Sequence, residues 1–155
     1  MAKRDEHESG TRVIKPELPE YIRTMVRGDY AANDAVEAKL DAEGWDGLPR
    51  YLAAVFFLAV DRRFGETGSH AEIIAFVGEL RAGLADGGPE INAEAAEQLI
   101  SSIIDPSLDY SMSQEMIGRI QAATVQKILT EENLSDSELD SLLAEAANLS
   151  SRPDR

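Results

Sequence analysis

Residues 51–60 read YLAAVFFLAV, an unbroken run of ten apolar residues in an otherwise strongly charged chain. A membrane-spanning helix needs about 20 apolar residues, so a run of this length is too short to cross a bilayer. It instead predicts a helix that is buried on nearly all sides at the centre of a globular bundle. We expect this helix over about residues 48–63, with Arg62 and Arg63 placed favourably against the negative end of its dipole.

The sequence on either side of this run predicts further helices. Apolar residues recur at helical spacing, and N-capping residues and breaks at Gly or Pro mark the ends. Three of the helix starts also carry a capping box, in which Ser or Asp precedes Glu by three residues. The pairs are Asp34 with Glu37, Ser69 with Glu72, and Ser135 with Glu138. The helices are expected from Leu18 to about Gly28, from Asp34 to Gly44, from Ser69 to about Leu84, from Asn92 to Pro106, from Ser113 to Glu132 and from Ser135 to Leu149.

These elements define a fold class and a domain organisation. No segment alternates apolar and polar residues between turn signals, so no sheet is expected. The sequence predicts an all-α fold, an irregular compact bundle of five to seven helices around the central buried apolar helix. A chain of 155 residues fits one domain of common size. We expect a flexible tail at 1–17, a single helical domain at 18–149 and a frayed C-terminus at 150–155.

The composition also bears on the compartment. The chain contains no cysteine, so nothing in it points to disulfides or to an oxidising environment. Residues 1–8 mix charges of both signs and precede no apolar segment, unlike a secretory signal. We therefore expect a cytoplasmic protein without a membrane anchor.

Negative charge is concentrated in the middle of the chain. The formal net charge is −14, and between Gly65 and Ser111 nine acidic residues accompany one basic residue, Arg81. Such a surface repels nucleic-acid phosphate and attracts basic proteins. Nucleic acid is therefore disfavoured as a partner, whereas solubility alone remains an alternative reason for the acidity.

The motifs of common catalytic and cofactor sites are missing. The chain has two histidines, His7 and His70, and neither a P-loop nor a glycine-rich dinucleotide motif. His70-Ala71-Glu72 copies the H-x-E fragment of zinc deaminases, but the cysteine pair of those sites is absent. Glu72 already has a sufficient role in its capping box. We expect no catalytic residue, no cofactor and no metal site.

One loop weakly resembles a calcium-binding loop. Residues 105–115 offer side-chain oxygens at alternate positions between two predicted helices. Tyr110, however, stands where the sharp turn of such a loop needs Gly, and Glu115 comes one position early. The segment is better explained as a proline turn followed by a serine cap.

A second pattern resembles a degenerate DNA-reading helix-turn-helix at residues 113–129. Two apolar helical stretches are present, but the short turn that should separate them is not. Residues 121–123 instead favour one continuous helix, and the acidic surroundings oppose phosphate binding. A DNA-binding regulator remains an alternative function.

By elimination, the leading hypothesis is an acidic interaction or regulatory protein that docks a basic partner and performs no catalysis. The partner would bind the acidic face of the helices between residues 66 and 97. The last helix, with its narrow leucine stripe, is the candidate for homodimerisation. The acidic residues assigned to the partner site are Glu66, Glu72, Glu79, Asp86, Glu90, Glu94 and Glu97.

The main alternative is a small-ligand-binding protein or an enzyme with an apolar pocket between helices. Aromatic side chains and an arginine pair near the central helix would line this pocket. The residues assigned to it are Trp45, Tyr51, Arg62 and Arg63.

Overall fold

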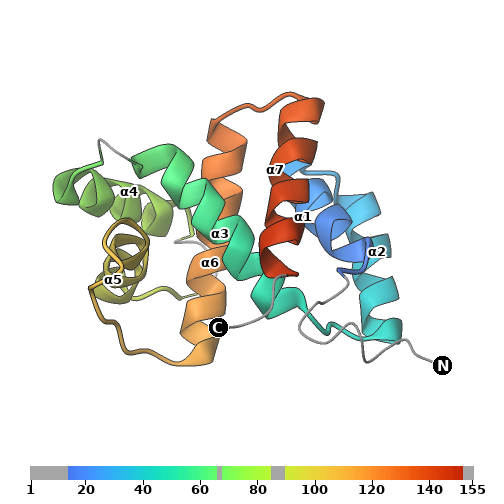
Figure 1. The fold of residues 1–155 in the computed structure, drawn as a ribbon, viewed down its shortest axis with the longest axis horizontal. Coiled ribbons are helices and arrows are strands. Elements are labelled where there is room, and N and C mark those ends of the chain that lie inside the picture. The colour runs from blue at the N-terminus through green and yellow to red at the C-terminus, as the bar shows by residue number, and fades with distance from the viewer. Residues whose placement is uncertain (1–13, 66–67, 85–89, 152–155) are drawn as a thin grey trace. The chain divides into compact units, whose positions relative to one another are not determined.

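The structure is a computed structural model that describes residues 14–65, 68–84 and 90–151. These residues form seven α-helices and no strand (Figure 1), which confirms the all-α prediction. The helices are α1 (Glu17–Arg27), α2 (Tyr30–Glu43), α3 (Leu48–Phe64), α4 (His70–Gly83), α5 (Ala93–Ile104), α6 (Gln114–Glu131) and α7 (Asp136–Ser150).

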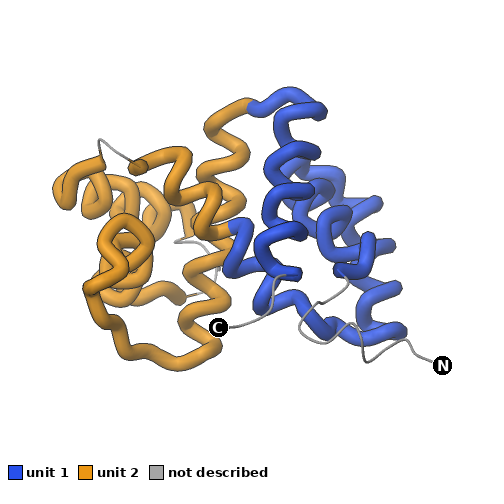
Figure 2. The backbone as a smooth tube through the Cα atoms, viewed as in Figure 1, with its two compact units in different colours: residues 1–55, 134–155 blue, residues 56–133 orange. Residues whose placement is uncertain are grey.

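The helices group into two compact units (Figure 2). Unit 1 comprises residues 1–55 and 134–155, and in it α1 packs against α2 and α7. Unit 2 comprises residues 56–133, and in it α4, α5 and α6 pack against one another. Helix α3 belongs to both units, since the boundary falls within it. The expected single domain over 18–149 stays a prediction.

Helix α3 is the expected central apolar helix. Its buried residues recur at helical spacing, and they are Tyr51, Leu52, Val55, Phe56, Ala59, Val60 and Phe64. The prediction that this helix is buried on nearly all sides was wrong, however, because Ala53, Phe57 and Asp61 form an exposed stripe along it. Residues four apart share one helix face, and the charged Asp61 keeps its end of that face in water. Phe57 is consequently 42% exposed.

Two predicted capping boxes are confirmed. The Ser69 hydroxyl accepts a hydrogen bond from the Glu72 amide at 3.2 Å, and the Ser69 amide donates to Glu72 Oε1 at 3.0 Å. Ser135 and Glu138 form the same pair of bonds at 3.1 and 2.8 Å. Each box satisfies two backbone donors that the first turn of a helix would leave unpaired.

The predicted start of the second helix was wrong. Gly28 ends α1 in the left-handed conformation, with φ of 71°, and Asp29 then caps α2 by accepting from the Ala32 amide at 3.3 Å. Asp34 therefore lies inside α2. A glycine that terminates one helix directly before a capping residue can start the next with no connecting loop.

The core of unit 2 contains a buried threonine hydroxyl. Thr124 of α6 is fully buried, and within the described part of the chain its Oγ1 has no hydrogen-bond partner. Thr24 of α1, also buried, is a natural contrast. Its hydroxyl donates to Glu20 O at 3.0 Å and accepts from Asn33 Nδ2 at 3.0 Å.

We expect Thr124→Val to raise the free energy of unfolding by about 1 kcal/mol, because it removes an unpaired buried hydroxyl at nearly constant volume. Thr24→Val should lower it by about 1–2 kcal/mol, because Asn33 Nδ2 would lose one of its two acceptors and keep only Tyr21 O. Urea denaturation of both variants checks this. Destabilisation by Thr124→Val would show that its hydroxyl is hydrogen-bonded in solution.

Candidate functional site

The five described acidic residues of the predicted partner site all lie in unit 2. Glu66 and Asp86 fall outside the described residues. Glu72 and Glu79 lie on α4, Glu90 precedes α5, and Glu94 and Glu97 lie on α5. All five are exposed except the half-buried Glu97. Four of them line two hollows in pairs, Glu72 with Glu79 and Glu94 with Glu97.

The first hollow, which we call the Glu72 hollow, has a volume of about 260 Å³. It lies between the end of α3 and the exposed side of α4. Its lining residues are Arg63, Phe64, Glu72, Ala75, Phe76 and Glu79. The rings of Phe64 and Phe76 meet edge to face, with centroids 5.4 Å apart, and form its apolar floor.

Of the two carboxylates that line the Glu72 hollow, Glu79 forms an ion pair with Lys127, whereas Glu72 forms none with any described residue. Lys127 Nζ lies 3.3 Å from a Glu79 oxygen and 2.5 Å from a Glu131 oxygen. Arg63 Nη1 lies 3.0 Å from Glu131, and its guanidinium carbon is 5.2 Å from the Phe76 ring centroid. The hydrogen bond from Lys127, together with that from Arg63, lowers the pKa of the Glu131 carboxyl.

The second hollow, which we call the Glu94 hollow, has a volume of about 330 Å³. Helix α5 supplies four of its residues at positions i, i+3, i+4 and i+7, which share one helix face. The start of α4 and the connection between α5 and α6 supply the rest. Its lining residues are His70, Glu94, Glu97, Gln98, Ser101, Leu108 and Asp109.

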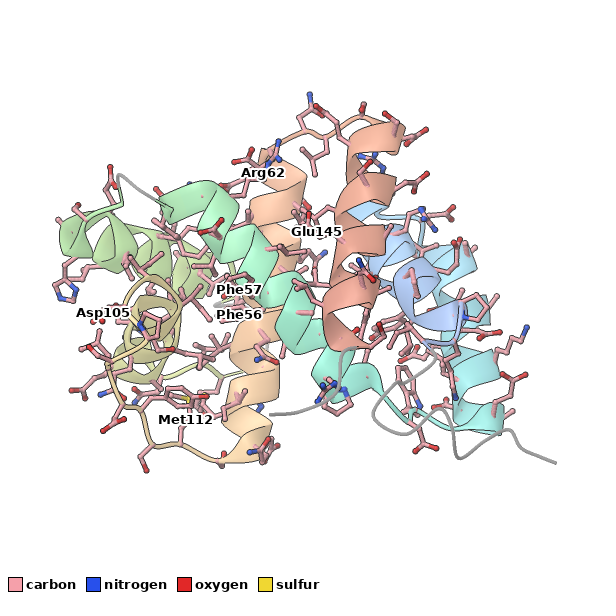
Figure 3. The ribbon with its side chains drawn as sticks, viewed as in Figure 1. Phe56, Phe57, Arg62, Asp105, Met112 and Glu145 are labelled. Atoms are coloured by element: carbon pink, nitrogen blue, oxygen red, sulfur yellow. The ribbon has the colours of Figure 1, made fainter. Side chains whose placement is uncertain are left out.

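Local hydrogen bonds position the elements that line the Glu94 hollow. Asn92 Oδ1 caps α5 by accepting from the Ala95 amide at 2.8 Å. After α5 ends, Asp105 Oδ1 accepts from the Ser107 amide at 3.1 Å and from its hydroxyl at 2.7 Å, and these bonds lower the Asp105 pKa. Figure 3 labels Asp105 at this end of α5. This turn carries Leu108 and Asp109 back to the face of α5.

Three carboxylates line the Glu94 hollow, those of Glu94, Glu97 and Asp109. Neither Glu94 nor Glu97 nor Asp109 forms an ion pair with any residue in 14–65, 68–84 or 90–151. No three His, Asp or Glu side chains in those ranges come together as a metal-binding group. Leu108, 45% exposed, adds an apolar surface. The arrangement suits a long cationic side chain, whose stem is apolar and whose head is charged.

Sequence reasoning missed His70, Leu108 and Asp109 as lining residues of this hollow. The spacing of Glu94, Glu97 and their neighbours on α5 was a readable signal for a shared face. No comparable signal exists for the loop residues, because their return to α5 depends on the turn that Asp105 and Ser107 form.

The residues of the predicted ligand pocket each have a structural contact within their own unit. In unit 1, the fully buried Tyr51 donates its hydroxyl to Leu143 O at 3.2 Å, and burial raises its pKa. Trp45 Nε1 donates to Asp41 Oδ1 at 2.7 Å. In unit 2, Arg62 Nε lies 3.2 Å from Glu132 Oε1. Figure 3 labels Arg62 near the end of α3.

Two further expectations concern α6 and α7. Helix α6 is continuous over Gln114–Glu131, so residues 113–129 do not form the break that a helix-turn-helix requires. The leucine stripe of α7, with Leu139, Leu142 and Leu143, is buried within unit 1. The stripe is therefore covered by the chain's own residues, and α7 packs against α1 of unit 1.

Among the described helices, none is long and apolar enough to cross a membrane. Comparisons of this chain with protein-family models, with curated proteins and with solved structures find no match.

Proposed function

We propose that this protein is a non-catalytic interaction protein that binds a basic protein partner through the acidic surface of unit 2. The observation that carries the proposal is the Glu94 hollow, where Glu94, Glu97 and Asp109 surround a concave surface without an ion-pair partner among the described residues. Carboxylates with no cation of their own attract a lysine or arginine of a partner at long range.

The contrast with the Glu72 hollow supports this choice. There, Lys127 lies beside Glu79, and Arg63 and Lys127 both lie beside Glu131. Carboxylates that already have internal partners gain less from a further cation. The Glu94 hollow is therefore the stronger electrostatic target. The ligand-pocket alternative has no comparable observation in its favour, since its residues are engaged in structural contacts.

Charge reversal at the Glu94 hollow should slow association. We expect Glu94→Lys with Glu97→Lys to reduce the on-rate for a basic partner recovered from native extract by about tenfold at low salt, and to flatten its dependence on ionic strength. Glu79 is left unchanged because a lysine there would face Lys127. Stopped-flow association at several salt concentrations provides the measurement.

A matched control separates the site from net charge. Asp34→Lys with Glu37→Lys makes the same change of charge at the same spacing on exposed positions of α2 in unit 1. This variant should keep nearly the parental on-rate. Equal slowing by both variants would mean that only total charge matters, and no slowing by either would leave the acidity as a solubility device.

A further inference from the structure

The connection between α5 and α6 contains a stretch of unpaired backbone. Residues 108–113 run between the two helices without helix, strand or turn, as the plain ribbon there shows (Figure 1). The backbone of residues 109–112 forms no hydrogen bond with any residue in the described ranges. All residues from 105 to 111 are exposed. The peptide groups of this stretch are therefore free to pair with another molecule.

The other connections that the structure describes in full, at residues 28–29, 44–47 and 132–135, are tied to the fold through their backbone. Between α2 and α3, the Gly44 amide donates to Leu40 O at 2.6 Å. Between α6 and α7, the Leu134 carbonyl accepts from Arg27 Nη2 at 2.9 Å. Such bonds must break before a segment can leave the surface, whereas residues 109–112 have none to break.

Apolar and polar side chains alternate along the same stretch. Leu108 and Tyr110 are each 45% exposed, and Met112 is half-buried. An endopeptidase pairs with the backbone of an extended substrate and takes the side chain before the cut bond into a specificity pocket. In a serine endopeptidase of the chymotrypsin class, this pocket is an apolar slot. Exposed apolar side chains on unpaired backbone meet both requirements.

The structure on either side selects Tyr110 among these three residues. The Leu108 amide donates to Asp105 O at 3.0 Å, so Leu108 is joined to the turn that precedes it. Met112 directly precedes the residue that caps α6. Cleavage after Leu108 or Met112 would require that turn, or the first turn of α6, to open. Tyr110 lies two residues from both.

We infer that the peptide bond between Tyr110 and Ser111 is a cleavage site for a serine endopeptidase with an apolar specificity pocket. The serine oxygen of the enzyme bonds to the Tyr110 carbonyl carbon, and the C–N bond to Ser111 breaks as its nitrogen takes a proton and leaves as an amine. Water then releases the Tyr110 carboxylate from the enzyme. Cleavage needs no basic partner, so its test is separate from that of the proposed function.

The cut divides the chain but leaves the packing of unit 2 in place. It falls between α5 and α6, which pack against each other and against α4. Leu99 of α5 and Ile120 of α6 are both buried. Because this burial does not depend on an exposed peptide bond, the fragments 1–110 and 111–155 should stay together. The new carboxylate of Tyr110 lies one residue from Asp109, which lines the Glu94 hollow.

The test is limited digestion of the full chain with chymotrypsin under native conditions. Mass spectrometry should identify 1–110 and 111–155 as the first products, and size-exclusion chromatography should show them as one particle of the parental size. Tyr110→Ser should slow the first cut at least about tenfold, because serine does not fill an apolar pocket. In urea that unfolds the parent, cuts should also occur at its other aromatic residues.

Tyr30→Ser is the matched control. Tyr30 is 75% exposed, more than Tyr110, but it is the first residue of α2, and this helix must open before its backbone can pair with an enzyme. Tyr30→Ser should therefore keep the rate of the first cut within about twofold of the parental rate. Circular dichroism of both variants checks that the helices are retained.

Each other outcome overturns the inference. A first cut at Tyr30, at Trp45 or elsewhere in the native chain would show that unpaired backbone does not decide the site. An unchanged rate for Tyr110→Ser would place the cut at another residue. The same products from native and urea-unfolded protein would mean that sequence, and not the fold, selects the bond. Fragments that separate on the column would contradict the expected retention of the packing of unit 2.

Discussion

Phe56→Ala should lower the free energy of unfolding by about 3–5 kcal/mol. Phe56 is 1% exposed and contributes to the buried face of α3. Removing its ring loses the transfer free energy of a large apolar group and leaves a cavity that a close-packed helix cannot fill. Urea denaturation followed by circular dichroism measures the loss.

The adjacent residue supplies the control for this prediction. Phe57 has the same side chain on the same helix but is 42% exposed. Figure 3 labels both residues. Phe57→Ala should therefore cost less than about 1 kcal/mol. Similar losses for the two variants would mean that the burial pattern of α3 is wrong.

Leu143→Ala should lower the free energy of unfolding by about 2–5 kcal/mol. Leu143 is 1% exposed on the inner face of α7, and its carbonyl accepts the hydrogen bond from the buried Tyr51 hydroxyl. A cavity at this position weakens the packing that joins α7 to the rest of unit 1. Thermal and urea denaturation both report it.

Glu145→Ala, on the exposed side of the same helix, is the comparison for Leu143→Ala. It should change stability by less than about 0.5 kcal/mol, because an exposed side chain loses little on truncation. If Leu143→Ala were equally mild, the leucine stripe of α7 would not be part of a core. The stripe would then be free to pair with another copy.

The helices could be predicted because their signals are local. Three helix starts are marked by a side chain that accepts a hydrogen bond from the backbone amide three residues later, at Ser69, Asn92 and Ser135. The start of α2 was missed because the signal depends on Gly28, whose left-handed conformation turns the chain in one step. A plausible capping box at Asp34 then competed with the correct cap at Asp29.

The arrangement of the acidic residues could not be predicted to the same extent. The concentration of carboxylates between residues 65 and 111 is visible in the sequence. Which of them have cation partners is not, because Lys127 reaches Glu79 from a helix distant in the chain.

The division of the chain has a consequence for its biosynthesis. Unit 1 is built from two segments, residues 1–55 and 134–155, whereas unit 2 is one continuous segment between them. During translation, α1 and α2 leave the ribosome first, but α7, against which α1 packs, leaves last. Unit 2 can therefore assemble while the nascent chain is still growing, whereas the first-made helices must wait for the last. Premature termination before α7 would leave α1 without the helix it packs against, without the ion pairs of Arg23 and Arg27 with Asp140 and Asp136, and more open to proteolysis.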